Sequence, residues 1–201
     1  MAQPWGMTDS FALLGVPRRF WLEEEALKER FHTLTAEHHP DVAGEAAGRA
    51  FAALNVAYQT LRDPRARLRH WLELEAPGAG TRATVPAAAE AFFPAVAAKK
   101  EALEAFLKRR TAAGGAVAKA LLFPEQFALH EGLEECLAAL ERERTALLGQ
   151  LPALDAQWQA ATPEERRALT NTLLEAAQTL GYLERWAAQL REGIVQLQTG
   201  G

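Results

Sequence analysis

The feature that most constrains this chain is a long run of apolar residues near its C-terminus, spaced alternately four and three positions apart. The run follows Thr162 and Pro163, and Thr162 and Glu165 have the spacing of an N-terminal capping box. Because such steps keep side chains on one side of an α-helix, the pattern predicts one long helix packed in a bundle or coiled-coil seam. The run consists of Leu169, Leu173, Ala176, Leu180, Leu183, Ala187, Leu190, Ile194 and Leu197.

The rest of the chain also favours helices. Ala, Leu, Glu, Gln and Arg are frequent, and runs of β-branched residues are scarce, so we expect an all-α fold. A stretch rich in Pro, Gly and Thr interrupts the periodicity at 77–85 and predicts a linker. The expected organisation is therefore an N-terminal domain at 1–76, the linker, and a C-terminal antiparallel helical bundle at 86–201.

The N-terminal part shows the end signals of several helices. Gly15 ends a short first helix, and Pro40 ends the longer helix that precedes the segment 36–44. Asp63-Pro64 separates the last two helices. Between Gly15 and Asp63 lie two longer amphipathic segments, which predict an antiparallel helix pair flanked by short helices. The segment "AEHHPDVAG" at 36–44 joins the two long helices.

Composition and charge exclude several classes of protein. The formal net charge is −4 and neither part of the chain is basic, which disfavours a nucleic-acid-binding module. No apolar run approaches the about 20 residues that a membrane span needs, and the N-terminus does not resemble a signal peptide, so we expect a cytoplasmic protein without membrane contact. The single cysteine, Cys136, cannot form an internal disulfide, and its leucine-rich surroundings predict a core residue rather than a nucleophile.

The two histidines and the aspartate at 36–44 raise the question of catalysis or metal binding. A zinc site needs three or four ligands, and the remaining histidines show no HExxH spacing or cysteine pairing. No nucleophile elbow or glycine-rich phosphate loop is present either, so we expect no catalytic residue, no metal site and no cofactor. A purely structural alternative is that His39 caps a helix and Asp41 starts a turn.

Two stretches together resemble the J-domain of DnaJ-like co-chaperones. The stretch "ALKERFHTLTAEHHPD" is followed by "AFAALNVAYQTLRDP", in the order and at the separation typical of that family. The resemblance implies that His39, Pro40 and Asp41 bind a DnaK-type chaperone and trigger its ATP hydrolysis, so the protein itself would not be an enzyme. It also implies a basic face on the helix before this tripeptide, to which Lys28 and Arg30 would contribute.

The layout of J-domain, short linker and helical bundle is similar to the HscB family of iron–sulfur cluster assembly co-chaperones. That resemblance implies an HscA-like or general DnaK-type partner and an iron–sulfur scaffold protein that docks on the bundle. The stretch "FPEQFALHEGLEE" resembles the first bundle helix of the family, and "LGYLERWAAQLREGIVQL" resembles its last. On this basis 86–110 would be an extra helix, outside the family pattern.

In that family the scaffold binds a hydrophobic patch with acidic neighbours. Carried over to this sequence, the patch predicts client contacts at Phe123, Phe127, Glu131, Glu135 and Tyr182. A core position for Phe127 and a solvated helix face for the two glutamates fit the same spacing. An alternative function is a J-domain adaptor for a client unrelated to iron–sulfur assembly.

Overall fold

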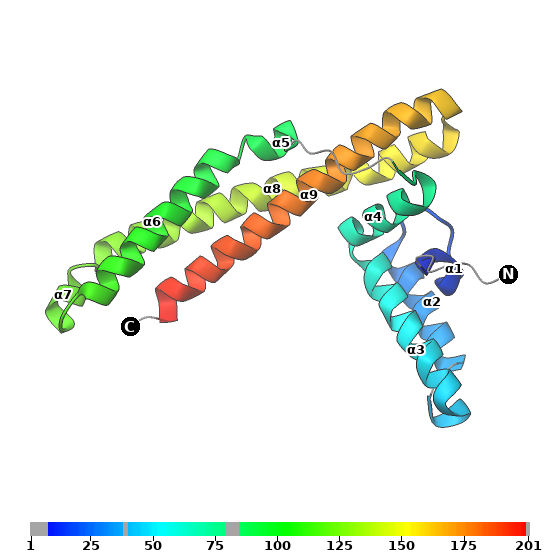
Figure 1. The fold of residues 1–201 in the computed structure, drawn as a ribbon, viewed down its shortest axis with the longest axis horizontal. Coiled ribbons are helices and arrows are strands. Elements are labelled where there is room, and N and C mark those ends of the chain that lie inside the picture. Colours follow the sequence, from blue (N-terminus) through cyan, green and yellow to red (C-terminus); the bar gives the residue numbers. More distant parts are fainter. Residues whose placement is uncertain (1–7, 38–39, 79–84, 200–201) are drawn as a thin grey trace. The chain divides into compact units, whose positions relative to one another are not determined.

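The computed structural model describes residues 8–37, 40–78 and 85–199. In these residues every regular element is a helix, which confirms the all-α class, and none of the described helices is long and apolar enough to cross a membrane (Figure 1). The contacts divide the chain into a first unit, Met1–Thr81 with Gln150–Ala177, and a second unit, Arg82–Gly149 with Gln178–Gly201. The helices are α1 (Ser10–Leu14), α2 (Glu24–Glu37), α3 (Pro40–Arg62), α4 (Pro64–Glu75), α5 (Ala87–Glu90), α6 (Phe93–Ala112), α7 (Ala116–Ala120), α8 (Phe123–Ala160) and α9 (Pro163–Thr199).

Helix ends in the first unit follow the capping signals in the sequence. The Asp9 carboxylate accepts hydrogen bonds from the backbone N–H groups of Phe11 and Ala12 at the start of α1. Gly15 ends that helix at φ +62, and a Cβ there would come within 2.8 Å of Arg30 Nη2. Asp63 caps α4, and Pro64 occupies the first turn of that helix.

The core of the first unit joins α1 and α4 to the long pair α2 and α3. Phe11, Phe20 and Trp71 are almost fully buried, and the rings of Phe31 in α2 and Tyr58 in α3 stack at 4.2 Å. This stack lies on the two amphipathic faces that the sequence predicts, so the antiparallel helix pair is confirmed.

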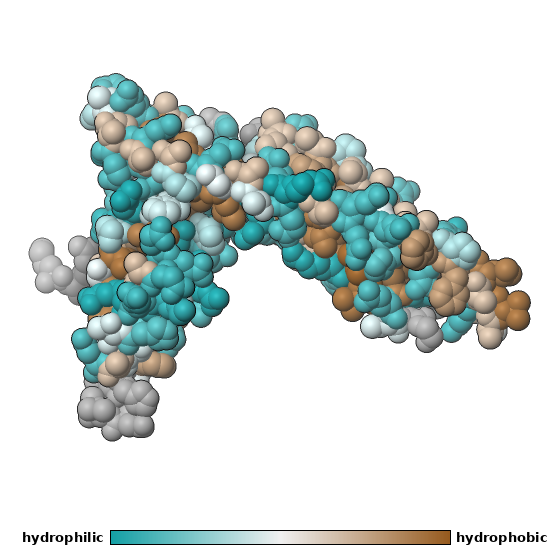
Figure 2. Space-filling model, turned by 180° about the vertical axis from the view of Figure 1, so that it is seen from behind, coloured by the Kyte–Doolittle hydropathy of each residue, from teal (hydrophilic) through white to brown (hydrophobic). Residues whose placement is uncertain are grey.

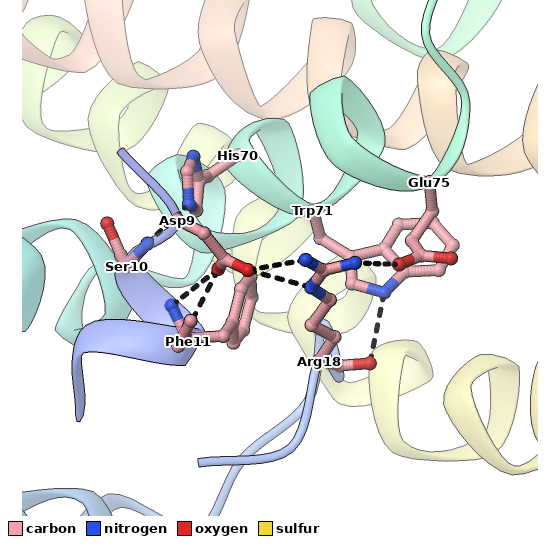
Figure 3. Close-up of polar contacts among 8 residues, drawn as sticks. Asp9, Ser10, Phe11, Arg18, His70, Trp71 and Glu75 are labelled. Carbon is pink, nitrogen blue, oxygen red and sulfur yellow. Dashed lines mark hydrogen bonds and ion pairs between the residues drawn. The ribbon is translucent and has the colours of Figure 1, made fainter. Parts of the chain in front are cut away.

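Polar contacts fasten the N-terminal turn to α4, as Figure 3 shows. The backbone N–H of Ser10 donates to Nε2 of the buried His70 at 3.0 Å. The Arg18 guanidinium bridges Asp9 and Glu75, and the Trp71 indole donates to the Arg18 carbonyl oxygen. Hydrogen bonds from Arg18 and from the capped N–H groups lower the pKa of Asp9 against the opposing effect of its partial burial.

Residues 150–177, from the end of α8 and the start of α9, pack in the same unit. The rings of Trp71 and Trp158 meet edge to face at 4.7 Å. Arg19 Nε donates to Oδ2 of Asp155 at 2.7 Å, and Asp155 is fully buried. Most of the sequence-predicted linker at 77–85 lies outside the described residues, and the domain boundary there stays a prediction.

The second unit contains α5 to α7 with parts of α8 and α9. Where the sequence predicts one helix at 86–110, the structure has α5 and α6, separated at Ala91-Phe92. The apolar core includes Phe106 from α6, Leu133 from α8 and Leu190 from α9. Cys136 belongs to this core as predicted, and burial raises the pKa of its thiol although Lys99 acts in the opposite direction.

Helix α8 continues through Pro152, although proline usually ends or kinks a helix. A proline inside a helix removes one hydrogen bond and costs about 3 kcal/mol. The residues on either side of it, Leu151, Asp155 and Trp158, are all buried, so tertiary packing compensates for that cost.

Helix α9 confirms the C-terminal periodicity. Thr162 donates from both its backbone N–H and its hydroxyl to the Glu165 carboxylate, at 2.8 and 2.9 Å, which forms the predicted capping box. Leu169 and Ile194 are half-buried, and the other apolar residues of the run are buried.

Candidate functional site

The His39-Pro40-Asp41 tripeptide lies between α2 and α3. His39 is outside the described residues, and Pro40 and Asp41 are described as backbone only. The sequence places the tripeptide in a loop, whereas α3 begins at Pro40, so Pro40 and Asp41 are the first two residues of that helix. Proline suits this position because its φ is already helical and its missing N–H would have no partner in the first turn.

The two basic residues predicted on α2 differ in how they are held. Lys28 is exposed and lies 3.5 Å from Glu25 on the same helix. Arg30 donates from Nε to the Leu14 carbonyl oxygen at 3.0 Å, so part of its guanidinium is used to hold α1. With Glu29 also exposed between them, α2 presents little net positive charge.

Four of the predicted client residues lie exposed on α8. Phe123 is 66% exposed and Phe127 is 64% exposed, so neither belongs to the core. The core position that the sequence also allowed for Phe127 is therefore excluded. Glu131 and Glu135 are exposed further along the same helix. Successive four-residue steps turn by about 40°, so these side chains follow a shallow spiral around α8 rather than a straight line.

The structure does not bring Tyr182 together with those four residues. Gln126 Nε2 donates to the Leu197 carbonyl oxygen at 2.8 Å, which fixes the start of α8 beside the end of α9. Tyr182 lies fifteen residues before Leu197 in the same helix, which corresponds to about 22 Å along its axis. Tyr182 therefore lies near the middle of α9, away from Phe123 and Phe127, and the assignment of these five residues as client contacts stays a prediction.

Tyr182 belongs instead to an aromatic cluster formed by Phe93, Tyr182 and Trp186. The rings of Tyr182 and Trp186 lie 5.4 Å apart, and those of Phe93 and Trp186 lie 6.4 Å apart. Phe93 is 59% exposed, and the Arg185 guanidinium lies 4.6 Å from the centre of the Tyr182 ring. The cluster therefore combines partly exposed aromatic surface with a cation.

Phe93 and Trp186 are not among the client contacts predicted from the sequence. A signal was present, because Phe93-Pro94 opens α6 in the same way as Phe123-Pro124 opens α8. Helix α6 precedes α8 and is the first long helix of the second unit, a position that the sequence interpretation gave to α8. The four-residue spacing of Tyr182 and Trp186 also places both on one side of α9.

The described side chains contain no group of three or more His, Cys, Asp or Glu residues placed to hold a metal ion. The described residues line several cavities at the surface. One of about 440 Å³ lies on the first unit, between α1 and α3, and is lined mainly by small apolar side chains around Ala53 and Val56. Its lining includes Ser10 and His70, but Nε2 of His70 accepts the hydrogen bond of the Ser10 backbone N–H, so this nitrogen is not free to act as a base towards a hydroxyl.

A comparison with protein-family models matches residues 9–70 to the DnaJ domain. Among curated proteins, the chain is 35% identical over 103 residues to a co-chaperone protein HscB homolog of Aromatoleum aromaticum, covering 48% of this chain and 58% of that protein. It is 35% identical over 74 residues to the co-chaperone protein HscB of Proteus mirabilis, covering 33% and 43%. The match therefore spans about half the length of these curated relatives.

Among solved structures, the fold is similar to that of the chaperone HscB from Vibrio cholerae. The TM-score is 0.59 at 21% identity, and the match covers 94% of this chain and 99% of that one. At this identity the likeness concerns the fold, and it includes the helices after the J-domain. Residues 9–70 thus match the DnaJ domain, and the chain is similar in sequence and in fold to HscB co-chaperones.

Proposed function

We propose that this protein is a co-chaperone that stimulates ATP hydrolysis by a DnaK-type chaperone and delivers to it an iron–sulfur scaffold protein bound on the second unit. The observation that carries the proposal is the DnaJ-domain match at 9–70, which includes His39-Pro40-Asp41. The similarity to proteins named HscB supports the choice of client. Hydrolysis would take place in the active site of the partner, so this chain would act as its activator.

The chemistry of the tripeptide suits a contact of this kind. Pro40 fixes its own φ and restricts the backbone of His39, so little backbone entropy remains to be lost on binding. An imidazole and a carboxylate on either side of the proline supply directional hydrogen-bonding groups. The position of Pro40 and Asp41 at the start of α3 supports a rigid presentation of the segment.

The charge of α2 bears on the identity of the chaperone. Lys28 has Glu25 beside it, and Arg30 is bonded to Leu14, so electrostatic attraction from this helix is weak. A weak field slows association with any acidic partner. We therefore propose a dedicated, HscA-like chaperone that recognises the tripeptide by shape, in preference to a general one.

The test of the chaperone activity is His39→Gln, measured by single-turnover ATP hydrolysis of a DnaK-type chaperone. We expect the substitution to abolish stimulation while circular dichroism shows an unchanged helix content. His130→Gln, a substitution of the same kind on α8, is the matched control and should stimulate as the wild type does. Full stimulation by the His39 variant would refute the proposed activity.

For the scaffold, we propose the aromatic cluster of Phe93, Tyr182 and Trp186 as the docking surface. Aromatic side chains at a partly exposed position are frequent binding hot spots because they bury a large area at little entropic cost. An acidic residue is close in sequence, since the exposed Glu90 at the end of α5 precedes Phe93 by three residues.

The test is isothermal titration of an iron–sulfur scaffold protein into wild-type and variant chains. Phe93→Ala and Tyr182→Ala should each weaken binding about tenfold or more, the range typical of a hot spot. Phe127→Ala, an exposed phenylalanine on α8, is the control and should bind as the wild type does. If only Phe127→Ala weakens binding, the docking surface lies on α8 and not at the aromatic cluster. If the wild type does not bind the scaffold protein at all, the alternative function, an adaptor for a different client, is favoured.

A further inference from the structure

The cavity between α1 and α3 in the first unit has the composition of a ligand site. Its volume of about 440 Å³ falls within the range of small-ligand sites, which are mostly apolar with a few polar groups. Leu13 and Val56, which line it, are 36% and 67% exposed, and Figure 2 shows apolar residues, coloured brown, at the surface of the first unit. We define the α1–α3 groove by its apolar residues Leu13, Ala53 and Val56 and its polar residues Ser10, Thr60 and His70.

His70 supplies a hydrogen-bond donor in the wall of the α1–α3 groove. Its Nε2 accepts the Ser10 backbone N–H at 3.0 Å, so the neutral imidazole carries its hydrogen on Nδ1. Figure 3 shows this second nitrogen on the side of the ring away from Ser10, and it has no hydrogen-bond partner among the described residues. His70 is only 7% exposed, and a buried N–H without a partner is costly. A ligand that accepts this hydrogen bond would remove that cost.

Two hydroxyl groups lie in the same wall. Ser10 is 6% exposed and contacts His70 through its backbone, so its hydroxyl is left without a partner among the residues that the structure describes. The Thr60 hydroxyl donates to the Val56 carbonyl oxygen at 2.9 Å and can still accept a hydrogen bond. The α1–α3 groove therefore offers one N–H donor and two hydroxyl groups beside an apolar surface.

The charges around the α1–α3 groove select the class of ligand. The described residues that line it include no Lys, Arg, Asp or Glu. The cation of the neighbouring loop, Arg18, is already paired with Asp9 and Glu75. A fatty acid or another anion would thus lose its hydration without gaining a counter-charge. An uncharged peptide fits better, because each of its peptide groups carries one C=O acceptor and one N–H donor.

We propose that the α1–α3 groove binds a short, uncharged, apolar peptide segment of a partner protein. A peptide carbonyl oxygen accepts the hydrogen of His70 Nδ1, and a peptide N–H donates to the hydroxyl of Ser10 or Thr60. An apolar side chain of the segment occupies the space above Ala53, where the small methyl group leaves room.

The α1–α3 groove is separate from the His39-Pro40-Asp41 tripeptide. Ala53 follows Pro40 by thirteen residues in α3, which corresponds to about 20 Å along the helix axis. A bound segment would therefore leave the start of α3 uncovered. The groove adds a second binding site to the first unit, beyond the contact proposed for the tripeptide.

The first experiment is an NMR titration of the ¹⁵N-labelled full chain with the peptide N-acetyl-Leu-Val-Leu-amide. The wild type should bind with a Kd on the order of 100 μM, with shifts concentrated at the backbone amides of α1 and of residues 52–60. Ala53→Trp fills the groove and should bind at least tenfold more weakly, whereas Ala26→Trp, exposed on α2 and outside the groove, should bind as the wild type does.

Val56→Asp provides a second test if Ala53→Trp loses helix content. Val56 is mostly exposed, so the substitution should leave the fold intact while a charge in the groove weakens peptide binding at least tenfold. A wild type that does not bind the peptide, or shifts confined to other helices, overturns the proposal. Wild-type affinity in a folded groove variant overturns it as well.

A second experiment tests the polar groups and the ligand class. Ser10→Ala keeps the backbone N–H that His70 accepts but removes the hydroxyl, so peptide binding should weaken about fivefold, the effect of one neutral hydrogen bond. The ¹⁵N spectrum of the His70 ring at about pH 8 should show the hydrogen on Nδ1, and the Nδ1 resonance should shift on binding. A hydrogen on Nε2, or octanoate that binds the groove more tightly than the peptide, would refute the assignment.

Discussion

Three helical glycines, changed identically to alanine, should have three different effects on stability. A Cβ at Gly193 in α9 would lie 2.5 Å from Cδ2 of Leu103, a core residue that is 8% exposed. A Cβ at Gly132 in α8 would overlap with Lys99 Nζ, the far end of a long side chain. A Cβ at Gly149 in α8 would meet no heavy atom within 4 Å.

The expected free energies follow from these contacts. Alanine is more favourable than glycine in a helix by about 1 kcal/mol, so Gly149→Ala should stabilise the protein by about that amount. Gly132→Ala should stabilise it by slightly less, because the ammonium group of Lys99 can move into solvent. Gly193→Ala gains the same propensity but overpacks the core at a cost of roughly 1–3 kcal/mol, so we expect a net loss of about 1 kcal/mol.

Guanidinium unfolding followed by circular dichroism at 25 °C measures these differences. Gly149→Ala and Gly193→Ala should differ by about 2 kcal/mol in the free energy of unfolding. Leu103→Ala removes the obstructing methyl group, so Gly193→Ala should be neutral or stabilising in that background even though Leu103→Ala itself destabilises the protein. If Gly193→Ala proves as stable as Gly149→Ala, the close packing of α6 against α9 is refuted.

Two further predictions concern the first unit. Hydrogen bonds from Thr162 lower the pKa of Glu165, so the carboxylate stabilises the folded state above the pKa of the unfolded state, and this contribution is lost as the pH falls through the pKa of the folded state. The difference in the free energy of unfolding between wild type and Glu165→Ala should therefore be smaller at about pH 3 than at pH 7. A difference that does not change with pH would contradict the capping box. Asp155→Ala should cost about 2 kcal/mol, less than for a fully buried pair because Arg19 remains partly exposed. Glu73→Ala breaks the exposed pair with Arg69 and should cost less than about 0.5 kcal/mol in the same unfolding measurement, so equal losses would argue against the buried pair.

Helix ends determined by local chemistry could be predicted from the sequence. Asp9, Asp63 and Thr162 cap the helices that follow them through hydrogen bonds within three residues, and Gly15 ends α1 by its own backbone preference. Such signals act over one turn of helix. They can therefore be recognised in a short stretch of sequence.

Features that depend on distant contacts could not be predicted in this way. The continuation of α8 through Pro152 depends on the packing of Asp155 against Arg19 and of Trp158 against Trp71. The aromatic cluster joins Phe93 to Trp186 of α9, more than ninety positions away. In both cases helical periodicity identifies an apolar or aromatic face but does not identify the helix that it contacts.

The packing of residues 150–177 on the first unit has a consequence for dissecting the protein into fragments. A fragment cut at the Pro- and Gly-rich stretch would leave out Trp158 and Asp155. The Trp71 indole, now 1% exposed, would lose an aromatic neighbour, and the Arg19 guanidinium would lose its carboxylate. A fragment that ends there would therefore have an incomplete core and a lower stability than the full chain, so any loss of activity by that fragment would reflect unfolding as well as the missing second unit.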